Sequence, residues 1–508
     1  MQDDKKSESK EYLFPMGLQM NQNEPQEDSQ LNSKIARGMG WSGASTATVA
    51  VTGVLTNVIL ARLLEPDHFG LVFMTMIFTG FFQVAGEMGL SAALIQRKEE
   101  KLTPSHYHTA FWSGLILGAF FYLSAAFAIA PIAVWFFSEP LLDPLIKVMG
   151  VPLLIRPLFT THKAIMTKQM DFKSISIAEI SSIVVASVVT IALALAGWGV
   201  WSLALQNIWM ALIALVVFFW ITTYRPAFLF SRSAFNDIFL FSATVTGNNM
   251  VSYATDNLDN LLLGRFAGSH ELGIYGMIYM ITHTFRSYLM GVINKVMYPV
   301  YGKLQDNLEA MKDYYLAVVR YNTLAVFPIM TVFILLAHPL LSIGLGEDWA
   351  KGAFPLQMLS LSVMVHALGG TSGSLFRGLG RPGLNFRIFL SKTLIILIPG
   401  LGIGIYYFGI DGAAVVILIS KVYARLVHHY FLNKLVGVRA KEVFVSFLPA
   451  LIPFLVTLAL GAWALYFVDL QNLFHLILAI MLCAALTIGC TIFSAQKELK
   501  TIFRTYLK

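Results

Sequence analysis

The chain has 508 residues, of which 56% are hydrophobic and only 13% are charged, and its mean hydropathy is +0.67. Soluble globular proteins carry about twice that share of charged residues, so the composition excludes an ordinary soluble domain and indicates a membrane protein. The net charge of +7 then indicates basic cytoplasmic loops, and we expect no nucleic-acid partner.

The chain has two cysteines, too few and too close in sequence for a framework of stabilising disulfides. Cys483 and Cys490 lie in one apolar segment, where a helix would place them on the same face as packing residues. This spacing excludes an ordinary disulfide and a zinc site. We therefore expect no metal and no cofactor.

Residues 1–38 are polar and of mixed charge, without an apolar core and cleavage site, so we expect a disordered cytoplasmic tail. Fourteen apolar segments follow, each near or above the roughly 20 residues that a helix needs to cross a bilayer. They are 39–61, 69–94, 109–137, 142–163, 175–196, 199–221, 236–264, 272–299, 314–343, 353–376, 385–408, 411–433, 443–467 and 472–494.

The loops between these segments alternate in charge. Basic loops carry residues such as Arg97, Lys168 and Arg232, whereas the short loops at 138–140 and 197–198 carry no base. Loops rich in Lys and Arg stay in the cytoplasm. The pattern therefore places both termini in the cytoplasm and makes the protein a multi-pass membrane protein.

Two stretches 203 residues apart read as copies of each other. Asn57–Arg62 followed by Phe69-Gly70 reappears as Asn260–Arg265 followed by Leu272-Gly273. The offset covers six predicted spans, an even number, so both halves enter the membrane from the same side. This is a parallel repeat with a pseudo-two-fold axis along the membrane normal.

The repeat predicts an all-α integral membrane protein built from two six-helix lobes, the N-lobe at 39–221 and the C-lobe at 222–433. Residues 434–508 add two helices and a cytoplasmic tail. Six matched residues mark equivalent corners at the outer face, where a structural role and an outer gate are both open: Asn57, Arg62, Gly70, Asn260, Arg265 and Gly273.

Several bases fall at bilayer depth, where an ionised side chain is costly unless it faces water, a cavity or a partner. Arg286 lies at the centre of 272–299, and Lys421 and Arg425 share one face of 411–433, where two like charges repel unless an anion binds. The candidate cavity bases are Arg286, Lys392, Lys421, Arg425, Arg156, Lys295 and Arg320.

These bases favour a phosphate or pyrophosphate ligand, because an arginine grips two phosphate oxygens at once. The alternative is that they reach the cytoplasmic headgroups or pair with Glu87, Glu179 and Asp237.

Other polar residues within the spans have both a functional and a structural interpretation. His366 and His283 are candidate proton-coupling groups or satisfied interior histidines. Asn248 and Asn249 would contact a glycan or bond between helices. Trp41 is a candidate for the inner mouth of a cleft.

Four segments carry a family resemblance. They are Leu60–Gly70, Glu87–Arg97, Lys168–Lys173 and the Gly378–Pro382 loop. They resemble the Wzx-type polysaccharide flippases of the MOP superfamily and, within it, look most like exporters associated with colanic acid and teichuronic acid. Glu87 stands where the family pattern has Asp.

The resemblance implies two lobes that rock between inward- and outward-open states. It implies transport of undecaprenyl-pyrophosphate-linked oligosaccharide across the bacterial cytoplasmic membrane, with membrane lipids around the protein. A polysaccharide polymerase partner and H⁺ or Na⁺ as coupling ion stay open.

Two other function classes are weighed against a flippase. A membrane-embedded transferase needs a clustered acid/base or metal set, but the loops are short, and His106, His108, His428 and His429 lack carboxylates nearby in sequence. A multidrug exporter of cations needs buried carboxylates, whereas Asp256 and Asp259 lie toward the outer end of 236–264. We therefore expect a transporter and not an enzyme.

Overall fold

The computed structural model describes residues 25–86, 90–97, 102–467 and 473–494. These residues form helices and turns without a strand, which confirms the all-α class. Residues 1–24 of the predicted tail lie outside the described residues, and from Pro25 onward the chain is already helical, because α1 starts there.

The first half of the described chain contains α1 (Pro25–Leu63), α2 (Pro66–Gly86), α3 (Leu90–Gln96), α4 (Pro104–Leu123), η2 (Ser124–Ile129), α5 (Ala130–Phe137), α6 (Leu142–Met149), α7 (Pro152–Lys168), α8 (Phe172–Leu195) and α9 (Val200–Ile221).

The second half contains α10 (Arg232–Asp256), α11 (Leu258–Lys303), α12 (Leu308–Leu335), α13 (Ala337–Ser342), η3 (Glu347–Gly352), α14 (Ala353–Ala367), α15 (Ser372–Gly378), α16 (Pro382–Ser391), η4 (Lys392–Leu397), α17 (Ile398–Val436), α18 (Ala440–Phe467) and α19 (Leu473–Ser494).

Ten segments of the described residues are long and apolar enough to cross a membrane. Nine of them overlap one predicted span each, and Gly383–Val436 overlaps two, which meet at Gly409 with a positive φ of 54°. The predicted spans 142–163, 236–264 and 272–299 also fall on helices but are not among the ten. The count of fourteen therefore stays a prediction.

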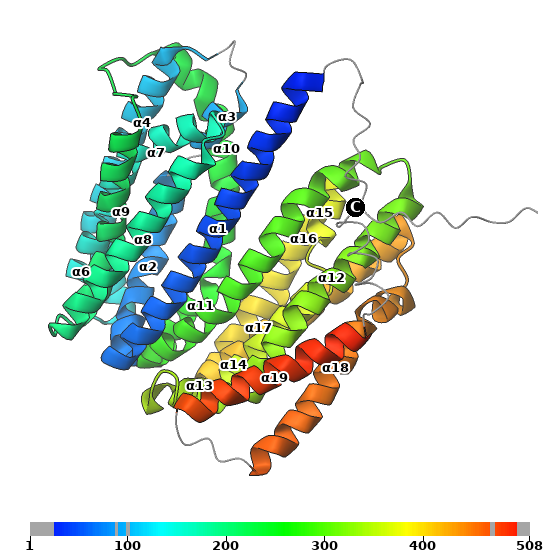
Figure 1. Cartoon of the computed structure of the whole chain (residues 1–508). Coiled ribbons are helices and arrows are strands. Elements are labelled where there is room, and N and C mark those ends of the chain that lie inside the picture. Colours follow the sequence, from blue (N-terminus) through cyan, green and yellow to red (C-terminus); the bar gives the residue numbers. More distant parts are fainter. Residues whose placement is uncertain (1–24, 87–89, 98–101, 468–472, 495–508) are drawn as a thin grey trace, which may run out of the picture.

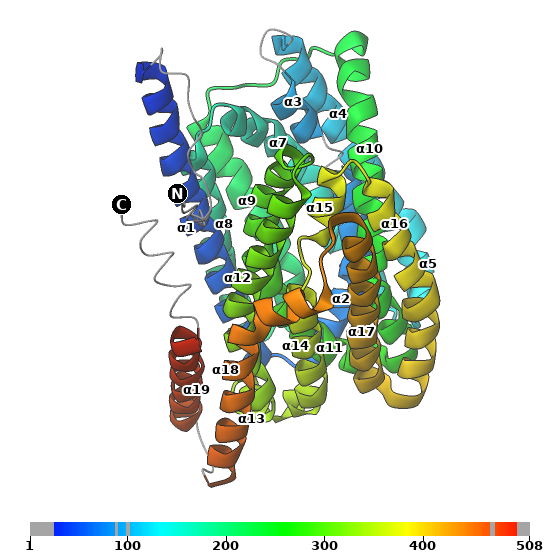
Figure 2. The ribbon, with the colours of Figure 1, turned by 90° about the vertical axis from the view of Figure 1, so that its right-hand side faces the viewer.

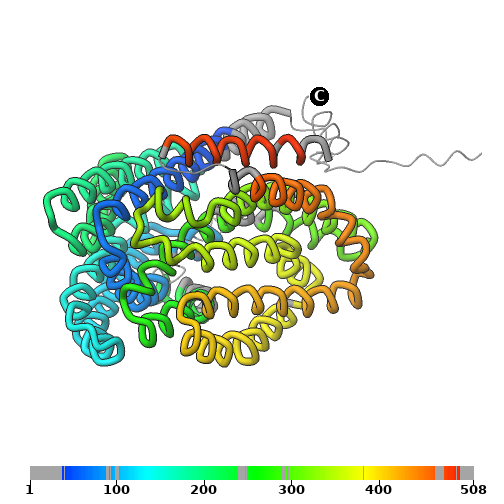
Figure 3. The backbone as a smooth tube through the Cα atoms, turned by 90° about the horizontal axis from the view of Figure 1, so that it is seen from below, coloured from blue at the N-terminus to red at the C-terminus, as the bar shows by residue number. Residues whose placement is uncertain are grey.

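The helices gather into two groups. In Figure 1, α4, α6, α7, α8 and α9 lie on the left, and α12, α14 and α17 lie on the right, with α18 and α19 beside them. Figure 3 shows the same two groups from below, and Figure 2 shows α16 and α17 together along one edge. α2 and α11 pack closely against each other and join the two groups.

α10 packs across the predicted boundary between the lobes. α10 follows the proposed boundary at residue 222, yet it packs on α2, α3 and α4 of the first half. Arg97 forms an ion pair with Asp237 of α10 at 2.7 Å, and the hydroxyl of Tyr253 donates to the carbonyl of Met76 at 2.7 Å. The lobe boundaries stay a prediction, and α10 packs against helices of the predicted N-lobe.

Trp349 is a buried contact between the halves. It lies in η3, is 1% exposed, donates from Nε1 to the carbonyl of Ala61 at 3.0 Å, and meets the Phe69 ring edge-on at 5.3 Å. A tryptophan that fills such a space with its N–H satisfied contributes both packing and a hydrogen bond.

Replacing Trp349 by phenylalanine is expected to destabilise the fold by about 1–3 kcal/mol, because it leaves the Ala61 carbonyl without its donor. Thermal unfolding of the purified protein in detergent measures this as a lower midpoint. The matched control is Trp220→Phe, since Trp220 is 85% exposed and its loss should leave the midpoint unchanged. Equal midpoints for the two variants would contradict the prediction.

Candidate functional site

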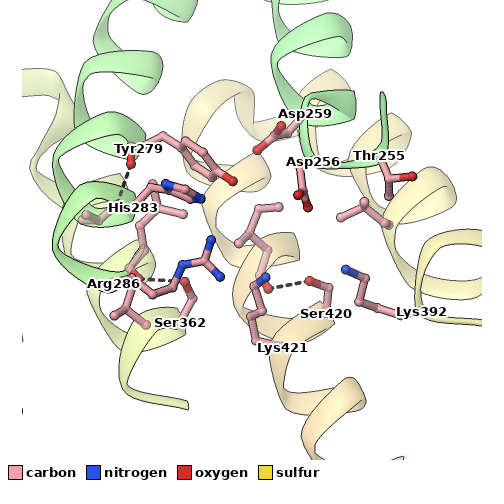
Figure 4. Close-up of a pocket in the computed structure, with 15 residues that line it drawn as sticks. Thr255, Asp256, Asp259, Tyr279, His283, Arg286, Ser362, Lys392, Ser420 and Lys421 are labelled. Carbon is pink, nitrogen blue, oxygen red and sulfur yellow. Dashed lines mark hydrogen bonds between the residues drawn. The ribbon is translucent and has the colours of Figure 1, made fainter. Parts of the chain in front are cut away.

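A polar hollow lies among the helices of the second half. It has a volume of about 550 Å³, part of it open to solvent, and is bounded by the end of α10 and by α11, α14, η4 and α17. Arg286 enters it from α11, Lys392 from the start of η4, and Lys421 from α17. Figure 4 shows these three bases facing the same space.

A second hollow of about 1080 Å³ adjoins the first, because Lys392 and Lys421 line both. It adds Arg425 and Arg377 as cationic groups. The two hollows together are termed the C-lobe cavity. Four of the seven candidate bases therefore line one cavity: Arg286, Lys392, Lys421 and Arg425.

Carboxylates do not neutralise these bases directly. Among the residues that the structure describes, Arg286, Lys392 and Lys421 form no ion pair within 4.0 Å. Arg425 donates from Nη1 to the hydroxyl of Tyr315 at 2.8 Å, and its buried Nη2 has no hydrogen-bond partner in that part of the chain. Cations this poorly compensated favour binding of an anion.

Two carboxylates also line the cavity. Asp259 is 2% exposed and accepts from the Tyr275 hydroxyl and from the backbone N–H of Asn260, both at 2.9 Å. Figure 4 shows Asp256 and Asp259 on one side of the hollow and the three bases on the other. Asp256 ends α10 and Asp259 lies at the start of α11, so the break between these helices brings the two carboxylates to the hollow.

Two of the other three candidate bases, Arg156 and Arg320, lie elsewhere. Arg156 borders a separate hollow of about 500 Å³ with Gln83 and Thr160 in the first half. Arg320 borders one of about 820 Å³ near Lys441, between α12 and α18. The side chain of Lys295 lies outside the described residues. Similar depth in the membrane therefore did not bring all seven bases together.

Both histidines that are candidates for proton coupling line the cavity. His283 lines the first hollow and His366 the second.

Two of the candidate glycan contacts, Asn249 and Trp41, do not line the cavity. The side chain of Asn248 lies outside the described residues, and Asn249 is exposed. Trp41 is 41% exposed, its ring lies under the Lys173 ammonium at 5.9 Å, and its carbonyl accepts from Ser176 at 3.0 Å.

Sequence reasoning missed several neutral polar residues of the second hollow. Asn385 and His428 contact each other at 3.3 Å, from His428 Nε2 to Asn385 Oδ1. Ser374 donates to Asn294 at 3.1 Å. Single Asn, Ser and His residues in apolar segments give no distinctive pattern, so only the fold could group them.

The six matched residues lie at the predicted outer corners of the two halves. Arg62 donates from Nε to the carbonyl of Gly344 at 2.8 Å and from its other end to that of Ile343, both in the opposite half. Arg265 lies 5.9 Å from the centre of the Phe136 ring, again in the opposite half. The two arginines therefore both join the halves.

Of the remaining corner residues, the asparagines bond locally and the glycines contact the opposite half. Asn57 donates to the carbonyl of Gly53 in its own helix at 2.8 Å, and Asn260 donates to Asn257 at 3.4 Å. Gly70 lies against the backbone of Ser269, and Gly273 against that of Pro66. These glycines leave room for two backbones to meet, so the predicted outer corner is closed.

The helical architecture defines the class of protein: a multi-pass membrane protein with a MOP transporter fold. The lipid II flippase MurJ in an inward closed conformation superposes with a TM-score of 0.68 at 14% identity over 90% of this chain and 99% of that one. An inward-facing multidrug resistance MATE family transporter of the MOP superfamily gives 0.62 at 16% identity, over 77% and 94%. At these identities the likeness concerns the fold alone.

The chain belongs to the family described as polysaccharide biosynthesis protein, whose model matches residues 59–354. Among curated relatives, the lipopolysaccharide biosynthesis protein WzxC of Escherichia coli (strain K12) is 24% identical over 410 residues, covering 80% of this chain and 82% of that protein. These matches confirm the predicted resemblance to Wzx-type proteins.

Proposed function

We propose that the protein is a flippase that moves undecaprenyl-pyrophosphate-linked oligosaccharide units across the bacterial cytoplasmic membrane for surface polysaccharide synthesis. The observation that carries the proposal is the C-lobe cavity, where Arg286, Lys392 and Lys421 face one space without an ion-pair partner among the described residues. The negative charge of a pyrophosphate would balance the positive charge of these three bases.

The chemistry of the cavity fits such a headgroup. Arg286 offers a planar fork that binds two phosphate oxygens, whereas Lys392 and Lys421 act as point charges. The neutral polar side chains of the second hollow, Asn385 among them, are suited to sugar hydroxyls. The apolar lipid chain stays in the bilayer, because moving it into water would cost free energy.

Transport then proceeds by alternating access. The lobes at 39–221 and 222–433 rock against each other, and the closed outer corner at Gly70 and Gly273 opens as the cytoplasmic side closes. Both termini lie in the cytoplasm, as the basic loops indicate. His366 and His283 are the proposed coupling groups if H⁺ drives the cycle, and a polymerase that consumes the exported units is the proposed partner.

A second candidate function is export of cationic drugs, which the carboxylates Asp256 and Asp259 favour. Asp259 is already engaged by Tyr275 and the Asn260 N–H, and the bases of the cavity outnumber the acids. The charge balance therefore favours an anionic cargo.

Deleting the gene in its host is expected to remove surface polysaccharide and to trap lipid-linked repeat units on the cytoplasmic leaflet, where reagents added to intact cells cannot reach the glycan. Complementation with wild type restores export, and Lys421→Ala restores it about tenfold less well, because the variant loses one charged contact. Lys434→Ala is the control, since Lys434 is an exposed base on the same helix. Normal surface polysaccharide with raised drug sensitivity would support the cation exporter instead.

A further inference from the structure

The outer corners of the two repeats contact each other reciprocally. A Cβ added at Gly70 would lie 1.8 Å from the carbonyl oxygen of Ser269, and one added at Gly273 would lie 1.9 Å from that of Pro66. Pro66 and Ser269 are 203 residues apart, as are Gly70 and Gly273. Two contacts related in this way identify a two-fold arrangement. The pseudo-two-fold axis therefore passes between these backbones.

Asp67 and His270 occupy equivalent positions of the repeat and meet at this axis. They are 203 residues apart, and His270 Nδ1 lies 2.9 Å from Asp67 Oδ2. Ser269 adds a hydrogen bond from its hydroxyl to Asp67 Oδ1 at 2.7 Å. If both copies carried the same charged residue, two like charges would face each other there. One acid and one imidazole make the contact attractive instead.

We propose that Asp67 and His270 form a pH-sensitive latch that holds the outer corner closed when the outer medium is acidic. A histidine side chain gains its charge between about pH 5 and 8, while an aspartate stays ionised over that range. As the pH falls, the closed corner gains an ion pair that an open corner lacks. As the pH rises, that ion pair is lost and the closed state is favoured less.

Asp67 is the carboxylate that contacts His270, and the neighbouring charged groups have other partners. His68 of α2 is close enough to Asp67 to interact electrostatically. Glu271 is paired with Lys351 of η3, and Asp411 of α17 lies near that pair. Arg62 of α1 is engaged by carbonyl groups. His68 is therefore a second imidazole beside Asp67, and its contribution must be separated from that of His270.

The test measures the distance between the lobes at the outer face as a function of pH. Spin labels are placed on Leu141→Cys and Glu347→Cys, both exposed positions near the outer corner of opposite halves, after Cys483 and Cys490 are replaced by alanine. Double electron–electron resonance of the protein in lipid vesicles gives the ratio of closed to open corners. Because the pair is about half exposed, raising the pH from about 5.5 to 8 should lower this ratio about two- to fivefold.

His270→Asn and Asp67→Asn should each abolish the pH dependence, and the exchanged pair Asp67→His with His270→Asp should restore it. His68→Asn should behave as the starting protein. A pH dependence that survives in His270→Asn, or that disappears in His68→Asn alone, would overturn the proposal. The readout is a distance between lobes, so its result is independent of which substrate the protein carries.

Discussion

Replacing Arg286 by alanine is expected to reduce transport of lipid-linked oligosaccharide about 10- to 100-fold at unchanged protein abundance. A hydrogen bond to a charged group contributes about 1.5–3 kcal/mol, and each 1.4 kcal/mol corresponds to a factor of ten. Arg286 has no ion-pair partner among the described residues, so its removal leaves no described carboxylate unpaired and should not destabilise the fold.

The same position distinguishes charge from geometry. Arg286→Lys keeps the positive charge but loses the planar fork, so its transport rate should lie between those of wild type and Arg286→Ala. The control is Arg439→Ala, since Arg439 is an exposed arginine outside the cavity. Transport is measured as labelled surface polysaccharide per unit of membrane protein. A wild-type rate in Arg286→Ala at normal abundance would contradict the assignment.

Replacing Gly273 by alanine is expected to prevent closure of the outer corner and to lower transport at least tenfold. The added Cβ would lie 1.9 Å from the carbonyl oxygen of Pro66, and a backbone atom cannot move away as a flexible side chain can. Overpacking of this kind costs about 1–3 kcal/mol. The cost is avoided when the corner is open, so the open state gains population.

The change is measured by the reactivity of a cysteine placed in the cavity. Ser420→Cys, with Cys483 and Cys490 replaced by alanine, should react faster with a membrane-impermeant thiol reagent from outside when Gly273→Ala is present. Gly53→Ala is the matched control, because a Cβ at Gly53 meets no atom within 4 Å. If Gly273→Ala transported normally and left the cavity cysteine unreactive, the closed corner would have no role in the cycle.

The sequence predicted the helical class, and the unfavourable energy of charge at bilayer depth was enough to find the central bases. Arg286, Lys392, Lys421 and Arg425 were chosen for depth, and the structure groups them in the C-lobe cavity. Depth does not say which side of a bundle a residue faces. For that reason Arg156 and Arg320, chosen by the same argument, border other hollows.

The position of Asp256 and Asp259 required the fold itself. The apolar segment 236–264 reads as one span, but α10 ends at Asp256 and α11 begins at Leu258. This break places both carboxylates beside the bases.

The repeat likewise predicted equivalent corners and left a gate between them open, but it did not predict which side chains meet. Equivalence follows from similarity in sequence, whereas the meeting of Asp67 with His270 depends on how the halves dock.

Reconstituted transport tests most directly whether the cationic C-lobe cavity carries a pyrophosphate-linked glycan across the membrane. Lipid-linked oligosaccharide extracted from the deletion strain is incorporated into vesicles with the purified protein. The fraction of glycan reached by an external, impermeant oxidant is then followed over time. Wild-type protein is expected to expose the inner-leaflet pool, whereas the double variant Lys392→Ala with Lys421→Ala is expected to leave it protected. Equal exposure by the double variant, or no exposure by wild type, would contradict it.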